Sequence, residues 1–91
     1  MKMKPKVRQM TTKGGRPAPN QFLLYTSDGT YFQSYNSTIA FRDYNGKIQL
    51  DEKTWDYSKT TAEYRRDFLG EGIDLTRDKI LSGEYQLTNL N

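Results

Sequence analysis

Two dipeptides, Asp28-Gly29 and Asn45-Gly46, constrain the fold of this 91-residue chain more than any other feature. Both lie between segments rich in aromatic and β-branched residues. The flanking segments are residues 22–27 and 30–35 for the first dipeptide, and 38–44 and 47–50 for the second. Two-residue connections of this composition favour the type I′ turn, whose twist matches that of a β-hairpin. The sequence therefore predicts two antiparallel hairpins.

The two hairpins differ in how their apolar side chains are distributed. If Ser27 pairs with Thr30, alternation places apolar side chains on both faces of the first hairpin. In the second hairpin, alternation places Ile39, Phe41, Ile48 and Leu50 on one face, and Arg42 and Gln49 on the other. We therefore expect the second hairpin to have one buried face and one solvated face.

The second half of the chain has helical patterning. Thr60 lies three residues before Glu63, a spacing at which each side chain can satisfy a backbone N–H of the other residue. This spacing predicts a helix over residues 61–69. We expect a second short helix, capped by Asp74 or Thr76.

A final strand is predicted after the second helix. Gly83 occupies the position of a left-handed residue that ends a helix, and residues 84–90 then alternate in polarity. The order of elements predicts one small α+β domain over residues 21–91. We expect a small antiparallel sheet of two hairpins plus a C-terminal strand, with two short helices on one face.

Charge is distributed unevenly along the chain. The first 20 residues carry six cations and no acid, whereas the rest carry eight Lys/Arg and eleven Asp/Glu. Pro, Thr and Gly separate the cations, so this segment cannot bury enough apolar surface to order itself in isolation. We expect residues 1–20 to be a flexible basic arm that binds polyanions. Its cations are Lys2, Lys4, Lys6, Arg8, Lys13 and Arg16.

The absence of Cys and His excludes many functional classes. Disulfides, thiolate or His-ligated zinc, and Ser-His or Cys-His nucleophiles all require these residues. Carboxylates offer one candidate metal site, but the predicted hairpin separates Asp43 from Asp51 by roughly 10 Å, too far for a shared ion. We therefore expect no enzymatic activity, no metal and no cofactor. The longest apolar run, residues 22–25, is too short to span a membrane.

Two parts of the body could add to a nucleic-acid surface. Tyr31 and Tyr35 lie on the first hairpin, where exposed rings could stack on bases, although aromatic residues are also needed to fill so small a core. The two helices have the dimensions of a helix-turn-helix, which would add the cations Arg65, Arg66, Arg77 and Lys79. An ordinary helical hairpin that covers a sheet explains the same pattern, and acids on the second helix would oppose phosphate.

Several segments resemble a family of small, poorly characterised proteins of tailed bacteriophages. These are GRPAPNQF at residues 15–22, YFQSYNS at 31–37, WDYS at 55–58 followed by TT at 60–61, and FLG at 68–70. The resemblance implies a protein made in the bacterial cytoplasm during infection, which binds nucleic acid or blocks a host enzyme or defence system. It assigns no functional residue.

Two functional hypotheses follow. In the first, the basic arm and the body bind DNA or RNA. In the second, the chain antagonises a bacterial host protein through Tyr35, Trp55 and Tyr57, because aromatic residues dominate interface hot spots. We expect Trp55 to be buried and Tyr57 to be partly exposed. Self-association or partner binding can contribute to the order of so small a domain.

Overall fold

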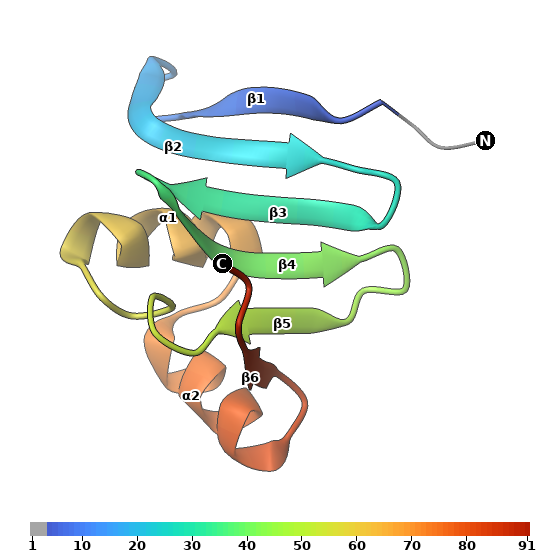
Figure 1. The fold of residues 1–91 in the computed structure, drawn as a ribbon. Coiled ribbons are helices and arrows are strands. Elements are labelled where there is room, and N and C mark those ends of the chain that lie inside the picture. The colour runs from blue at the N-terminus through green and yellow to red at the C-terminus, as the bar shows by residue number, and fades with distance from the viewer. Residues whose placement is uncertain (1–3) are drawn as a thin grey trace.

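The computed structural model describes residues 4–91, which form one sheet of six strands with two helices (Figure 1). In chain order the elements are β1 (Lys6–Thr11), β2 (Pro17–Tyr25), β3 (Gly29–Ser34), β4 (Ser37–Asp43), β5 (Ile48–Asp51), α1 (Lys59–Leu69), α2 (Ile73–Ser82) and β6 (Gln86–Thr88). The strands lie side by side in the order of the chain. All neighbours are antiparallel except β5 and β6, which are parallel. The predicted α+β class is confirmed.

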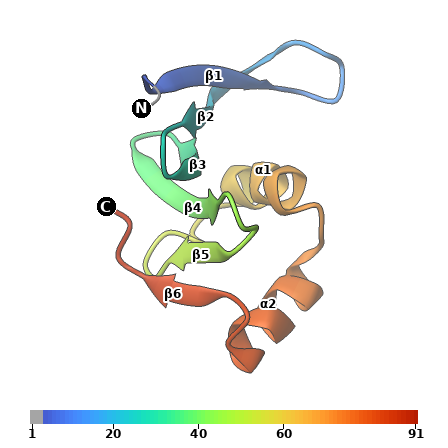
Figure 2. The same ribbon diagram turned by 90° about the vertical axis from the view of Figure 1, so that its right-hand side faces the viewer.

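Both helices lie on the same side of the sheet (Figure 2). Phe32 of β3 stacks on Phe68 of α1, with ring centroids 5.8 Å apart. The buried core between these layers consists of Ala18, Phe32, Ile39, Ala40, Ile48, Leu50, Tyr64, Phe68 and Tyr85. In the part of the chain that the structure describes, no helix covers the other side of the sheet, which we call the open face. Asn91 crosses one end of it and hydrogen-bonds the backbone of Thr38 (Figure 1).

Strand β1 corrects the expectation of a flexible arm over residues 1–20. Residues 6–11 pair antiparallel with β2, so that Lys6 lies opposite Tyr25 and Gln9 opposite Phe22. The composition argument treated this segment in isolation, whereas β2 supplies the backbone partners that a polar strand needs. Met10 also packs against the core. Residues 6–11 are therefore one edge of the sheet.

The hairpin of β2 and β3 forms where the sequence predicts it, with a register shifted by two residues. Tyr25 pairs with Thr30, and Thr26 N–H donates to Gly29 O, so Ser27 and Asp28 form the turn. A shift of two residues keeps every side chain on its predicted face. Gly29 has a different role from the one we expected, because it lies within β3.

The β4–β5 hairpin has a three-residue loop. Asp43 N–H donates to Lys47 O, and Gly46 in the loop has a φ of 85°. This is the hairpin type in which a turn is followed by a left-handed residue. The pairing is therefore one residue away from the predicted pairing.

A shift of one residue exchanges the two faces of a strand pair. Phe41 lies opposite Gln49, and Arg42 lies opposite Ile48. Our prediction that Phe41 shares a face with Ile48 was wrong. Arg42 instead faces the helices, with its guanidinium carbon 4.3 Å from the centroid of the Phe68 ring.

The helices begin at other residues than predicted. The N-cap of α1 is Ser58, whose hydroxyl accepts from Thr61 N–H, rather than Thr60. Gly72 precedes α2, and Gly83 ends it in the predicted left-handed conformation. Among the described residues, no helix has the length and apolar composition that a membrane crossing requires.

Candidate nucleic-acid interface

The cations of the predicted arm line one edge of the sheet and its adjoining loop. Lys4, Lys6, Arg8, Lys13 and Arg16 are all exposed, and we call them the basic edge. Lys2 lies outside the described residues. Within the described part of the chain none of the five forms an ion pair with a carboxylate, and the first acid in the sequence is Asp28. The two cations of β1, Lys6 and Arg8, therefore keep their positive charge uncompensated.

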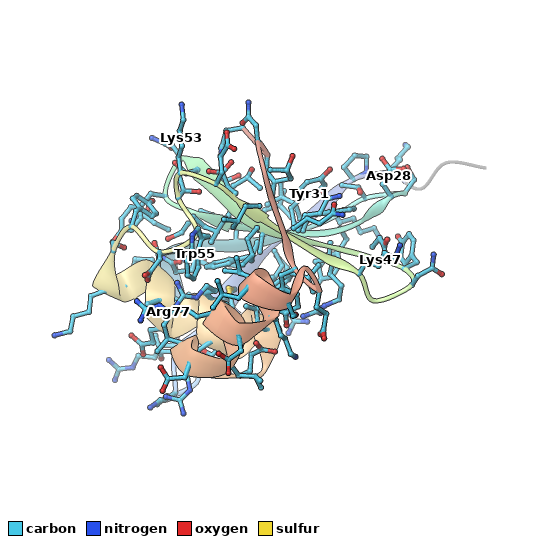
Figure 3. The ribbon with its side chains drawn as sticks, turned by 90° about the horizontal axis from the view of Figure 1, so that it is seen from below. Asp28, Tyr31, Lys47, Lys53, Trp55 and Arg77 are labelled. Atoms are coloured by element: carbon cyan, nitrogen blue, oxygen red, sulfur yellow. The ribbon has the colours of Figure 1, made fainter. Side chains whose placement is uncertain are left out.

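An apolar row begins at this edge and crosses the open face. Val7, Leu24, Tyr31 and Phe41 are successive partners across β1 to β4. Because Phe32 faces the helices, its neighbour Tyr31 faces away from them, as Figure 3 shows. Val7 is 66% exposed, and the other three are half-buried. The ring centroids of Tyr31 and Phe41 lie 4.4 Å apart.

Of this row, only Tyr31 was predicted as a binding residue. Val7 was missed because its segment was expected to be flexible, and Phe41 because a one-residue error placed it on the other face. Leu24 carries no signal of its own in the sequence. The signal in the sequence that could have indicated a strand was Val7, an apolar residue within the otherwise polar segment KVRQ at residues 6–9.

A hollow of about 780 Å³ lies on the helix side of the sheet, between the β1–β2 loop and α1. Lys13 of the basic edge lines it together with Lys59 and Arg66, the latter a predicted binding residue. Glu63 and Asp67 lie in the same lining. These acids offset the cations, so the positive charge is weaker here than along β1.

Arg65 is not available as a nucleic-acid contact, contrary to our prediction. Only 3% of it is exposed, because its guanidinium donates to Trp55 O and pairs with Asp56 at 3.1 Å. The guanidinium carbon also lies 5.2 Å from the Trp55 ring centroid. Arg77 remains exposed but lies 3.6 Å from the other Asp56 oxygen.

Lys79 is likewise held by carboxylates. Its ammonium lies 2.7 Å from Glu71 and 3.6 Å from Glu84. Glu71 also accepts hydrogen bonds from Tyr85 at 2.7 Å and from Thr76 at 3.1 Å. Burial alone would raise the pKa of Glu71, but these three donors outweigh it and hold the pKa below its ordinary value. We name Glu71, Thr76, Lys79 and Tyr85 the Glu71 cluster.

The predicted protein-interface residues lie around the β3–β4 turn. Tyr35 is 46% exposed and Tyr57 is 45% exposed, and the Tyr57 hydroxyl donates to Ser34 O at 3.3 Å. Partial exposure of Tyr57 is as predicted. Trp55 packs against the core but is half-buried, not buried as we expected (Figure 3).

The acidic segment at the end of β5 has a structural role. Asp51 is buried and accepts from the N–H groups of Lys53, Thr54 and Leu90 at 2.9–3.1 Å. Burial raises the pKa of Asp51, but hydrogen bonds from Leu90 N–H, the Thr54 hydroxyl and Lys53 N–H outweigh burial and hold this pKa below its ordinary value. Among the described residues, no group of three His, Cys, Asp or Glu side chains could hold a metal ion.

Comparisons with known proteins leave the activity open. Residues 5–84 match a family described as a family of unknown function (DUF8033). No curated protein and no solved structure matches the chain. Function therefore has to be inferred from the surfaces described above.

Proposed function

The chain belongs to this family of unknown function, and we propose that it binds single-stranded nucleic acid across the open face of its sheet. One observation carries the proposal: Val7, the first residue of the apolar row, lies between Lys6 and Arg8 in the edge strand β1. Alternation points these two cations to the helix side of β1, so a strand that crosses the open face would reach them around this edge. Cations on one strand hold the phosphate backbone by releasing counterions. Exposed rings on an adjacent sheet surface stack on bases of any sequence.

The location of the cations favours a single strand over a duplex. Bases can stack on Tyr31 and Phe41 only if they are unpaired. A duplex reader would instead place α2 in the major groove, but Lys79 is bound to Glu71, and Arg77 lies beside Asp56. The uncompensated positive charge lies on β1, at the rim of the open face.

Fluorescence anisotropy with labelled thymidine and uridine strands tests the proposal. Log affinity should fall linearly with log salt, and the double variant Lys6→Gln/Arg8→Gln should flatten the slope by roughly 0.7 for each lost phosphate contact. The matched control is Lys53→Gln, an exposed cation in the turn after β5 (Figure 3). An unchanged slope in the double variant would contradict the role of the basic edge.

Stacking is tested separately at the apolar row. Tyr31→Ala should weaken binding by the equivalent of about 1–3 kcal/mol, the typical contribution of one stacked base. Circular dichroism of the variant checks that the sheet remains folded. Normal affinity of a folded Tyr31→Ala protein would remove the open face from the proposal.

A second candidate function is antagonism of a bacterial host protein. The observation that favours it is a pair of half-exposed tyrosines near Ser34: Tyr35 follows it in the sequence, and the Tyr57 hydroxyl donates to its carbonyl oxygen. Tyrosines of this kind dominate interface hot spots. A partner captured from bacterial lysate after nuclease treatment, and lost in Tyr35→Ala, would support this function over nucleic-acid binding.

A further inference from the structure

A second hollow lies at the far end of the apolar row. Its volume is about 250 Å³, and it lies between the β4–β5 turn and the start of β6. Its lining residues are Phe41, Asp43, Lys47, Ile48, Gln49, Gly83, Glu84 and Gln86. Phe41 is also the last member of the apolar row, so the hollow continues the surface proposed above to bind a single strand.

The sheet register fixes which side chains meet in this hollow. Phe41 is the partner of Gln49 in β5, and Gln49 is the partner of Gln86 in β6. Paired residues point to the same side of a sheet, so the two amides lie beside the ring on the open face. Asp43 is two residues beyond Phe41 and points to that side as well.

The Asp43 carboxylate is held in place. Its Oδ1 atom accepts from the N–H groups of Asn45 and Lys47, both at 2.9 Å, which closes the turn. Oδ2 has no hydrogen-bond partner within the described part of the chain. Glu84 adds a second, largely exposed carboxylate, one oxygen of which lies 3.6 Å from the Lys79 ammonium. The hollow therefore offers two anionic acceptors, one ammonium from Lys47 and an aromatic wall.

We infer that this hollow receives a single nucleobase, and that its acceptors select guanine. Guanine carries an N1–H and an N2 amino group on one edge, which match carboxylate acceptors, and the O6 acceptor, which matches the Lys47 ammonium. Thymine and uracil present two carbonyl oxygens and one N–H, so the carboxylates would repel most of that edge. The volume lies below the roughly 300–1,000 Å³ of sites for drug-sized ligands, as a site for one base should.

This inference rests on the proposed function, and strands that differ at one position test it. The probes are a strand of about nine thymidines, within the usual site size, and the same strand with one central guanine, adenine or cytosine. The wild-type protein should bind the guanine strand about tenfold more tightly than the thymidine strand. Adenine and cytosine offer one amino group each and should fall in between.

Asp43→Asn is the decisive variant. Asparagine keeps an acceptor oxygen for the turn but replaces Oδ2 by an NH₂ donor, so the guanine preference should disappear while thymidine binding is retained. Glu84→Gln, outside the turn, should reduce the preference and does not depend on refolding of the loop. Asp28→Asn, an exposed acid in the β2–β3 turn, is the matched control and should leave the preference unchanged (Figure 3).

The outcomes distinguish failure of the guanine site from failure of the proposed single-strand binding. Binding of all four strands with equal affinity, or a guanine preference that survives both Asp43→Asn and Glu84→Gln, would overturn the guanine site alone. Failure of the wild-type protein to bind any strand would overturn the proposed function and this inference together.

Discussion

Glu71→Ala tests how far the fold depends on one buried carboxylate. The side chain of Glu71 is 6% exposed and accepts from Lys79, Tyr85 and Thr76 at 2.7, 2.7 and 3.1 Å. Removing one partner of a buried ion pair typically costs about 3–5 kcal/mol. The Lys79 side chain is 26% exposed and keeps Glu84 nearby, so water offsets part of this cost. We expect a loss of about 2–3 kcal/mol.

Such a loss is large for a domain of this size and should lower Tm by roughly 10–20 °C. Urea denaturation measures it directly, with the single Trp55 as fluorescence probe and circular dichroism as an independent one. Glu63→Ala, an exposed acid on α1, is the control and should change stability by less than about 0.5 kcal/mol. A Glu71→Ala midpoint equal to that of wild type would refute the reasoning.

The pH dependence gives a second readout of the same cluster. Because the folded-state pKa of Glu71 is lowered, its stabilisation is fully present above the unfolded pKa of about 4.3 and is lost as pH falls through the folded pKa. Glu71→Gln has no charge to lose. The stability difference between wild type and Glu71→Gln should therefore shrink below about pH 4. A difference that stays constant from pH 7 to acid would contradict the ionised state of Glu71.

Two further substitutions test the packing of the sheet by urea denaturation. Gly29 has a φ of 151°, and a Cβ on it would lie 2.2 Å from Arg42 O, so Gly29→Ala should destabilise the protein by at least about 2 kcal/mol. Gly14→Ala is the control, because a Cβ has room there and should not destabilise the protein. Equal urea midpoints for the two variants would contradict the close approach at Gly29. Asp51→Asn weakens the acceptor that holds Leu90 N–H and should cost about 1–2 kcal/mol. An unchanged midpoint would show that this carboxylate does not anchor the C-terminal segment.

Local signals predicted those elements that depend on neighbouring residues. The Asp28-Gly29 and Asn45-Gly46 dipeptides indicated two hairpins, and Gly83 the end of α2, because turns and helix ends are set by a few adjacent backbone angles. The pairing register of the strands was harder to predict from the sequence. The Asn45-Gly46 dipeptide fits loops of two or three residues, and the difference moves Phe41 to the open face and Arg42 to the helix side. Ile39 stays in the core as predicted, because the register between β3 and β4 is irregular at this residue.

Long-range pairing accounts for what could not be predicted. The polar segment of β1 becomes a strand only because β2 lies beside it, and nothing within residues 6–11 shows that partner. The sequence predicts that Arg65 is a surface cation. In the structure Arg65 is buried, because Trp55 and Asp56, in the segment before α1, contact its guanidinium. Of the candidate site, the cations and Tyr31 were therefore predicted, and the other three members of the apolar row were not.

The position of the basic edge has a consequence for self-assembly of the sheet. An edge strand exposes unpaired N–H and C=O groups that a second copy could use to extend the sheet. If two copies of β1 paired antiparallel, Lys6 and Arg8 of one copy would approach those of the other across a strand spacing of about 4.8 Å. Like charges directly opposite one another are destabilising, so this edge resists growth into a fibre. The cations that we propose to bind a polyanion would therefore also disfavour this pairing between copies of the chain.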